Sequence, residues 1–292
     1  MPTSLLKKLV RTVVPPPNVA ARTARHSGRV LEAWHELLSE RGEVSGAALA
    51  REALAAYHAL DDNYRNAFYS RLASEFTPDE AALRAAAERY LAQPTPCHLL
   101  QLQQAVVSPR QELFRRLNQA REGTATLVGL RARVLAGLKE HPDWHVLDAD
   151  LEHLFNSWFN RGFLHLKRID WHTPAIVLEK LIEYEAVHEI QGWEDLRRRL
   201  QDDRRCFAFF HPALPDEPLI FMEIALVKGI ATHVGPLLNH EAPVGDPEKA
   251  DTAMFYSITN CQPGLRGVSF GNLLIKQVAQ RLGEEFPRIK TF

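Results

Sequence analysis

The glycine-rich segment 261–271, Cys-Gln-Pro-Gly-Leu-Arg-Gly-Val-Ser-Phe-Gly, carries the residues whose types and spacing point most directly to chemistry. It follows an apolar, strand-like run at 252–258 and leads into 272–282, where apolar residues recur at helical spacing. The glycines allow close backbone approach, and the unpaired N–H groups at a helix start carry the positive end of its dipole. Strand, glycine-rich turn and helix in this order predict a phosphate-binding turn.

The spacing within this turn narrows the ligand class. It lacks the Lys-Ser/Thr ending of a P-loop and the G-x-G-x-x-G of a dinucleotide fold, which disfavours nucleoside triphosphates and NAD. Its Arg-Gly-x-x-x-Gly pattern resembles the pyrophosphate loop of the acetyltransferase-type fold, which holds coenzyme A. A tight strand-to-helix connection and, for the arginine, a solvated surface position are the alternatives. The predicted coenzyme-binding residues are Arg266, Gly267, Val268, Ser269, Phe270, Gly271 and Asn272.

Composition limits the protein class. The 292 residues suffice for two domains, and 35 basic against 36 acidic residues give no electrostatic case for nucleic acid. No apolar run is long enough to span a bilayer, so we expect no membrane partner. Three scattered cysteines without metal-ligand spacing suit a reducing compartment and predict no metal site. We expect a cytoplasmic protein; the basic segment 1–29 also fits a transit peptide, but a basic surface helix is the favoured interpretation.

The elements divide the chain into a helical half and a mixed half. Residues 18–163 show helical spacing almost throughout, and Ser108-Pro109 with Gln111 predicts a capping box at one helix start. From 164 the residues alternate, and 206–210 and 218–226 read as a hairpin joined by 211–217. Helices are expected at 174–186, capped by Thr173, and at 193–200. The fold class is therefore α+β, with an all-α helical bundle at 1–163 for support or oligomerisation and a mixed domain at 164–292.

Several short motifs then carry a family resemblance. They occur in the order and approximate spacing found in malonyl-CoA decarboxylases, to which the chain is similar over 150–292 and, more loosely, over its helical half. The motifs are Trp-His-Thr-Pro at 171–174, Glu-Ala-Val-His at 185–188, Arg-Arg-Cys-Phe at 204–207, Pro-Asp-Glu-Pro-Leu at 215–219, Phe-Tyr-Ser-Ile at 255–258, and Gly-Leu-Arg-Gly-Val at 264–268 with Gly271.

This resemblance implies a helical N-terminal domain joined to a catalytic domain of acetyltransferase-like (GNAT-type) fold. It implies a carbon–carbon lyase of fatty-acid metabolism that converts malonyl-CoA to acetyl-CoA and carbon dioxide, without a metal or organic cofactor. Coenzyme A is then part of the substrate. Family members assemble into oligomers, so the resemblance also implies a homo-oligomer formed through the helical domain.

One departure from the family concerns catalysis. The family's serine, in a Ser-x-Leu-Ser-Pro-like motif, and its histidine lie beyond Phe292, the last residue of the matching segment 286–292, so no catalytic residue is assigned within this chain. Pro287 ends a helix, and Ile289 to Phe292 read as the start of another strand. We therefore expect a truncated chain, incomplete at its C-terminus and inactive alone. A coenzyme A-dependent acyltransferase and a non-catalytic coenzyme A-binding or assembly module stay open as alternatives.

Other polar residues favour structural roles. Ser257 lacks a base and a nucleophile elbow, so it is expected to be an ordinary strand serine. Glu183, Glu185 and Glu189 are expected to form a solvated face with Lys180. The arginines at 197–199 and 204–205 are interpreted as surface charge, with contact to the coenzyme's 3′-phosphate as the alternative. Six histidines without ligand spacing are assigned packing or surface roles: His165, His172, His188, His211, His233 and His240.

Overall fold

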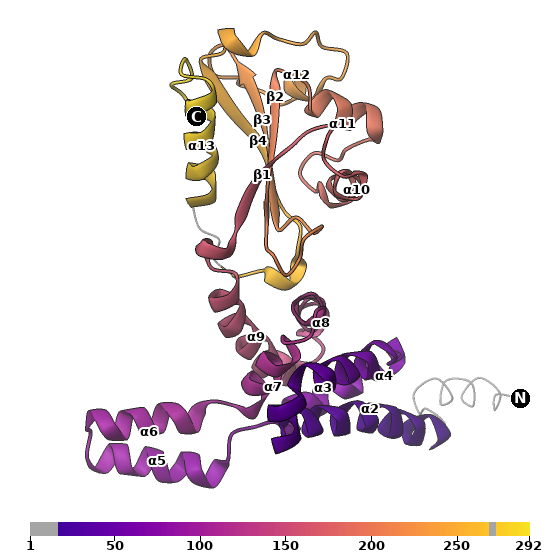
Figure 1. Ribbon diagram of the computed structural model, residues 1–292, viewed down its shortest axis with the longest axis vertical. Coiled ribbons are helices and arrows are strands. Elements are labelled where there is room, and N and C mark those ends of the chain that lie inside the picture. Colours follow the sequence, from indigo (N-terminus) through magenta and orange to yellow (C-terminus); the bar gives the residue numbers. More distant parts are fainter. Residues whose placement is uncertain (1–16, 269–272) are drawn as a thin grey trace, which may run out of the picture. The chain divides into compact units, whose positions relative to one another are not determined.

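The structure, a computed structural model, describes residues 17–268 and 273–292. The chain divides into two compact units, one ending at His153 and the other beginning at Leu154. The first unit is helical and the second contains a sheet (Figure 1). An α+β chain with a helical N-terminal part is therefore confirmed. The division falls inside a helix, ahead of the expected boundary at 163/164, and the first strand begins at His165.

Helices follow one another with short connections in the first unit. Their bounds are α2 Pro17–Leu38, α3 Glu40–His58, α4 Asp62–Glu75, α5 Glu80–Ala92, α6 Pro96–Val106, α7 Pro109–Leu117, α8 Gly123–Gly137, the 3₁₀ turn η1 Pro142–Trp144 and α9 His145–Trp158.

An aromatic cluster forms the core of this unit. Trp34 of α2 is fully buried and packs edge-on against Phe68 of α4, with ring centroids 4.9 Å apart. Its indole N–H donates to the carbonyl of Ala53 in α3 at 3.1 Å, so burial leaves this donor satisfied. The hydroxyls of Tyr57 and Tyr69 share a 2.8 Å hydrogen bond. These contacts tie α2, α3 and α4 into one bundle.

A buried carboxylate replaces the capping box expected at 108–111. Ser108 is the N-cap of α7 and Pro109 follows it, as predicted, but Ser108 makes no side-chain cap bond. Its hydroxyl donates instead to Asp150 of α9 at 2.8 Å, and the Gln111 amide donates to the same carboxylate at 2.8 Å. Arg110 completes the group with a 2.9 Å ion pair to Asp150. The capping-box prediction was wrong because these side chains bridge two helices rather than close one.

The second unit is a four-stranded antiparallel sheet of order β1-β2-β3-β4. Its elements are η2 Arg161–Phe163, β1 His165–Ile169, α10 Ala175–Tyr184, α11 Trp193–Arg199, β2 Arg204–Phe210, β3 Ile220–Val227, α12 Gly235–Leu238, η3 Pro247–Lys249, β4 Thr252–Asn260, η4 Pro263–Leu265 and α13 Leu273–Glu285. The predicted hairpin is β2–β3, and it is confirmed. Thr173 does not cap α10, whose N-cap is Pro174; the threonine hydroxyl accepts from the amide of Asp170.

Helices cover both faces of this sheet (Figure 1). α13 packs on one face through Leu274, Val278 and Leu282. α10 and α11 pack on the other through Leu178, Leu181 and Leu196. Every residue of β2 is buried as a result, which is why this strand reads as a nearly continuous apolar run rather than an alternating one.

A bulge marks β4. Glu223 pairs with Ser257 while its neighbour Ile224 pairs with Phe255, so Tyr256 has no cross-strand partner. The extra residue lies in the middle of the strand, between its paired halves.

The last residues of the chain pair with the other edge of β4, but over a shorter span than predicted. Thr252 and Thr291 form a parallel bridge, and the amide of Ala253 donates to the Thr291 carbonyl at 2.9 Å. Phe292 lies outside this bridge and is 53 % exposed. The strand expected from Ile289 to Phe292 is therefore a single bridge at Thr291, and its predicted extent was wrong. The apolar side chains of residues 289–292 indicated an extended backbone. A strand also needs consecutive backbone pairing with a neighbouring strand, and here only Thr291 forms a bridge to β4.

Replacing Asp150 with asparagine should destabilise the helical unit by about 3 kcal/mol or more, because the nearly buried guanidinium of Arg110 loses its counter-charge. Urea unfolding followed by circular dichroism measures the change. Asp62→Asn is the matched control, since Asp62 pairs with Arg133 at an exposed site and should cost less than about 1 kcal/mol. Equal losses in the two variants would contradict this assignment.

Candidate functional site

The candidate phosphate-binding turn follows β4. η4 begins two residues after the strand ends, and the backbone then reaches Gly267 with φ of 86°. This left-handed conformation has little cost only for glycine. The backbone conformation at position 267 therefore explains why a glycine stands there.

Hydrogen bonds within the turn already use some of its amides. The amide of Arg266 donates to the Pro263 carbonyl at 3.1 Å, and that of Val268 donates to Leu265 at 3.0 Å. A phosphate at these two positions must compete with the turn bonds. Gly267 is the other described member of the predicted set. The remaining members, Ser269, Phe270, Gly271 and Asn272, lie outside the described residues.

A cavity of about 370 Å³ lies beside the turn. Its walls come from the end of β4, from η4 and from the residue before β3. The lining residues are Leu219, Asn260, Gln262, Pro263, Leu265, Arg266, Gly267 and Val268. Three of the seven residues predicted to bind coenzyme A therefore line one hollow, whose walls mix apolar side chains with amide groups.

Ser257 is buried in β4 and serves a structural role. Its hydroxyl lies 2.9 and 2.8 Å from the two carboxylate oxygens of Glu185. Only 2 % of Ser257 is exposed, so a substrate cannot reach it for nucleophilic attack. The interpretation of Ser257 as a strand serine agrees with this geometry.

The family resemblance places the catalytic serine and histidine beyond Phe292. Phe292 directly follows Thr291, which forms a bridge to the start of β4 at the edge of the sheet. The glycine-rich turn follows the other end of β4. The position of the two catalytic groups relative to Phe292 stays a prediction.

Glu185 is not part of a solvated face, so that expectation was wrong. It is 5 % exposed and accepts from the amides of Val187 and His188 at 2.8 and 2.9 Å, and from the Thr259 hydroxyl at 3.0 Å. This carboxylate ties the chain after α10 to β4. Lys180 pairs instead with Glu217, in the turn before β3.

The arginines expected at the surface are mostly buried, which corrects the surface-charge interpretation. Arg198, Arg199, Arg204 and Arg205 are each 3–6 % exposed, and Arg197 alone of this group is exposed. The pairing partners explain the difference: Asp203 holds Arg198 at 2.6 and 2.9 Å, Asp195 and Glu223 hold Arg199, and Glu285 holds Arg205 at 2.7 Å. Sequence spacing showed the charges but not these partners, most of which come from other elements.

Glu223 is a buried carboxyl that was not predicted from the sequence. It is 1 % exposed, and burial raises its pKa to about 7 even though Arg199 lies 2.9 Å away. Its second oxygen has no hydrogen-bond partner among the described residues, and the same is true of the buried Tyr256 hydroxyl at the bulge. The signal in the sequence was a lone acid inside the apolar run of β3.

Two of the six histidines share a cavity, and a third lies against an aromatic ring. Among the described residues, no group of three or more His, Cys, Asp or Glu side chains is arranged to hold a metal ion. His188 and His240 line a common cavity of about 420 Å³ together with Asp195 and Arg199. The ring of His211 lies 4.7 Å from the ring of Phe159 at a tilt of 47°, and burial lowers the pKa of His211.

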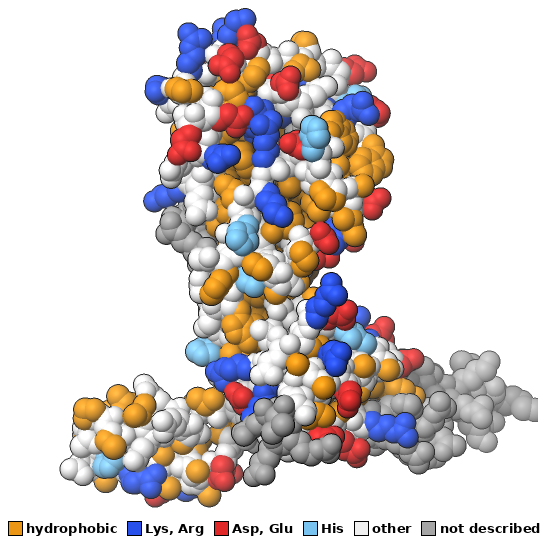
Figure 2. All heavy atoms as spheres, viewed as in Figure 1, with side chains coloured by type: hydrophobic (Ala, Val, Ile, Leu, Met, Phe, Trp, Pro, Cys, Tyr) orange, Lys and Arg blue, Asp and Glu red, His pale blue; other side chains and the backbone are white. Residues whose placement is uncertain are grey.

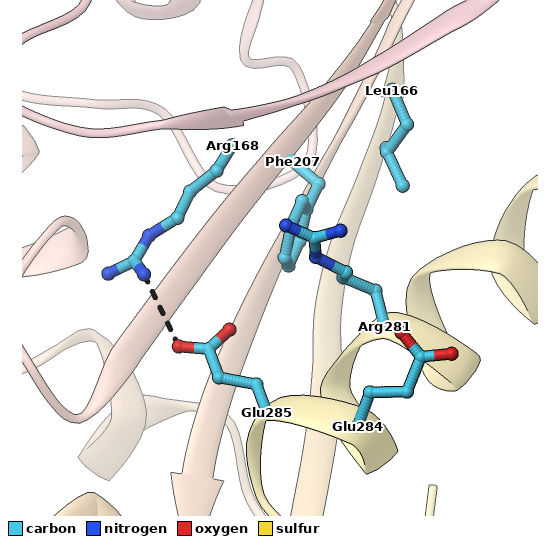
Figure 3. Close-up of a pocket in the computed structure, with 6 residues that line it drawn as sticks. All are labelled: Leu166, Arg168, Phe207, Arg281, Glu284 and Glu285. Carbon is cyan, nitrogen blue, oxygen red and sulfur yellow. Dashed lines mark hydrogen bonds and ion pairs between the residues drawn. The ribbon is translucent and has the colours of Figure 1, made fainter.

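A further hollow of about 480 Å³ lies between α13 and the strands β1 and β2. Its lining residues are Leu166, Arg168, Phe207, Arg281, Glu284 and Glu285. Figure 3 shows Arg168 and Glu285 pointing toward one another, and their ion pair measures 3.2 Å. Two arginines and two glutamates give this hollow no net preference for an anion or a cation.

Glu223→Gln should make unfolding less dependent on pH. An unfolded glutamate releases its proton near pH 4.5, whereas Glu223 in the fold retains it to about pH 7. The stabilisation from the neutral form is complete below pH 4.5 and lost as pH rises through 7. As pH rises from 5 to 8, the free energy of unfolding of the variant should increase by about 2 kcal/mol relative to that of the unsubstituted chain. Urea unfolding at each pH measures this difference. Glu194→Gln, at an exposed position, is the control; parallel profiles for both variants would refute the assignment.

Among the helices that the structure describes, none has both the length and the apolar content needed to cross a bilayer.

Comparisons with known proteins cover both units. The family model of the malonyl-CoA decarboxylase N-terminal domain matches residues 76–159, and that of the C-terminal domain matches 162–292. The mitochondrial malonyl-CoA decarboxylase of Anser anser anser is 38 % identical over 193 residues, which are 64 % of this chain and 38 % of that protein. The enzyme of Mus musculus is 37 % identical over 198 residues, covering 65 % and 40 %.

The solved structures that match this chain are also malonyl-CoA decarboxylases. The crystal structure of malonyl-CoA decarboxylase from Rhodopseudomonas palustris matches with a TM-score of 0.85 and 49 % identity, over 91 % of this chain and 66 % of that one. The Agrobacterium vitis structure matches with a TM-score of 0.85 and 47 % identity, over 90 % and 65 %. This chain thus spans less than two thirds of the length of the solved chains and about two fifths of the curated relatives. By these matches to both domain models and to solved structures, the chain belongs to the malonyl-CoA decarboxylase family.

Proposed function

We propose that this chain forms the helical part and the coenzyme A-binding part of a malonyl-CoA decarboxylase, a carbon–carbon lyase of fatty-acid metabolism. The relatives carry this activity in their names, and the activity comes to this chain through the family. The observation that carries the proposal is the turn after β4, with Gly267 in a left-handed conformation beside a cavity lined by its own residues. Malonyl-CoA is the proposed substrate and acetyl-CoA the product.

The order of elements supports an acetyltransferase-type (GNAT-type) arrangement for the second unit. The turn joins β4 to α13, and the chain then returns parallel to β4 at Thr291. A phosphate group at this turn would meet the start of α13, where a helix dipole favours negative charge. We propose that the diphosphate of coenzyme A binds at Arg266–Asn272 and that Gly267 allows its close approach.

The reaction needs orientation and an oxyanion site. When the bond to the carboxylate carbon breaks, carbon dioxide leaves and the electron pair moves onto the thioester carbonyl as an enolate. A proton then goes to the former malonyl carbon, which gives acetyl-CoA. Binding of the coenzyme far from this carbon supplies the orientation. The chemistry itself requires no metal and no organic cofactor, and none is proposed.

No catalytic group is proposed within residues 1–292. Ser257 is too deeply buried to attack a substrate, and the resemblance places the family's serine and histidine beyond Phe292. We therefore expect coenzyme A binding but no decarboxylation from this chain alone. Release of carbon dioxide from labelled malonyl-CoA by the chain would show that its catalytic groups lie within these residues. Transfer of an acetyl group to an amine would favour the acyltransferase alternative instead.

Gly267→Val should weaken coenzyme A binding at least about tenfold, because a β-branched residue does not tolerate a φ of 86° and the turn must change shape. Isothermal titration with coenzyme A measures the effect. Gly192→Val is the matched control, since Gly192 has a φ of 85° at the start of α11, away from the turn. Unchanged binding in Gly267→Val, or equal loss in both variants, would contradict the proposed site.

We also propose that the helical unit mediates homo-oligomer formation, through α5 and α6. These two helices pack mainly on each other, and only Ala86 of α5 and no residue of α6 is buried. Figure 2 shows apolar side chains gathered over this pair. The large exposed apolar residues here are Leu91, Leu99, Leu100, Val106 and Val107. A second copy of the same pair would complete a four-helix bundle around them.

The double variant Leu91→Lys/Leu100→Lys should dissociate the oligomer, because opposing copies would bring buried lysines together. Analytical ultracentrifugation over a range of protein concentrations measures the self-association. Val146→Lys/Ile230→Lys is the control, since these residues are also exposed and apolar but lie outside α5 and α6. If the control dissociates as readily, or the first variant stays associated, the surface is misassigned.

We infer a cytoplasmic location from the cysteine pattern and the interpretation of the basic N-terminal segment as a surface helix. The names of the goose and mouse relatives give mitochondria as the alternative compartment.

A further inference from the structure

A further cavity lies at the opposite end of the sheet from the glycine-rich turn. It has a volume of about 390 Å³ and lies where β2 begins and β3 ends, next to α12. Apolar residues, including Leu226, Leu237 and Ala250, form part of its wall. The charged residues that line it are Arg198, Asp203, Arg204, Lys228, Asp246 and Lys249. None of these belongs to the proposed coenzyme site.

Two buried arginines share one carboxylate in the wall of this cavity. Arg198 forms a two-pronged ion pair with Asp203 at 2.6 and 2.9 Å, and Arg204 approaches the same carboxylate at 3.0 Å. Arg198 is 3 % exposed and Arg204 is 4 % exposed. Asp203 also accepts from the amide of Gly245 at 2.9 Å, so both of its oxygens are hydrogen-bonded. One carboxylate thus stands against two buried guanidinium groups.

The arginines retain unused hydrogen-bonding capacity. The Nε–H groups of Arg198 and Arg204 are both buried, and neither has a partner among the described residues. Buried donors without partners are rare in native proteins, and a bound ion is one of the recognised explanations. Burial and the neighbouring Arg198 also lower the pKa of Arg204, as expected where positive charge is under-compensated.

Charge at the cavity mouth adds to this excess. Lys228 and Lys249 are residues that line the cavity and reach solvent, and Lys249 pairs with Asp246 at 2.9 Å. Four cationic side chains against two carboxylates leave two positive charges around one hollow. This balance matches a dianion better than a singly charged carboxylate.

We propose that this cavity binds a phosphate-type dianion, at a site separate from the coenzyme turn. The nine residues of β4, at roughly 3.3 Å each, separate the two ends of the sheet. In coenzyme A the 3′-phosphate is attached to the ribose that carries the diphosphate, so a diphosphate at the turn cannot place its 3′-phosphate here. A phosphate at Arg198 and Arg204 is therefore a different ligand.

Titration of the full chain with inorganic phosphate, at constant ionic strength, tests the site by calorimetry. Lys228→Gln/Lys249→Gln should bind phosphate about tenfold more weakly, while both solvent-accessible positions leave the fold intact. The control Lys139→Gln removes a solvent-accessible lysine from the helical unit and should bind as the unsubstituted chain does. Absence of saturable phosphate binding, or equal weakening in control and double variant, would overturn the proposal.

Two further measurements distinguish this site from a general carboxylate site and from the glycine-rich turn. Acetate should bind at least about tenfold more weakly than phosphate, and equal binding would contradict the assignment to a dianion. Gly267→Val should leave phosphate binding unchanged while it weakens coenzyme A binding. Loss of phosphate binding in Gly267→Val with retention in the lysine double variant would move the phosphate to the turn and refute this proposal.

Discussion

Coverage of both faces of one small sheet is the constraint on which the second unit depends. Because α13 lies on one face and α10 with α11 on the other, β2 and β3 have no solvent-facing side. Any charged residue on these strands must then find a partner inside the protein. Arg205 reaches Glu285 of α13, and Glu223 reaches Arg199 of α11, so the ion pairs also fix the helices to the sheet.

The same constraint applies to β4. This strand carries the bulge at Tyr256 and the hydroxyl groups that bind Glu185, and the glycine-rich turn follows its end. Glu185 holds the segment after α10 against the strand through two hydroxyls and two amides. A rigid strand with an anchored neighbour is a suitable support for a turn that must present its backbone in one conformation. Its left-handed residue, Gly267, needs that support.

Local pattern predicted much of the fold. Helical spacing in the first half and the apolar runs of β2, β3 and β4 each match an observed element, because short-range periodicity reports which face is buried. The order strand, glycine-rich turn and helix near the end of the chain was also predicted, although the strand expected up to Phe292 is only a bridge at Thr291. Side-chain partners were not predicted: Ser108 was expected to cap its own helix and instead reaches Asp150, 42 residues away.

The sequence by itself determined the element types, the position of the turn and the family, since each depends on residues close together in the chain or on short motifs in order. Tertiary structure decided which charges are buried and what they bind. Arg198 and Arg204 look like a surface patch in the sequence, but both are buried and paired with Asp203, and Arg204 also donates to the carbonyl of Leu237 in α12. Burial depends on contacts between distant elements, and no local spacing encodes it.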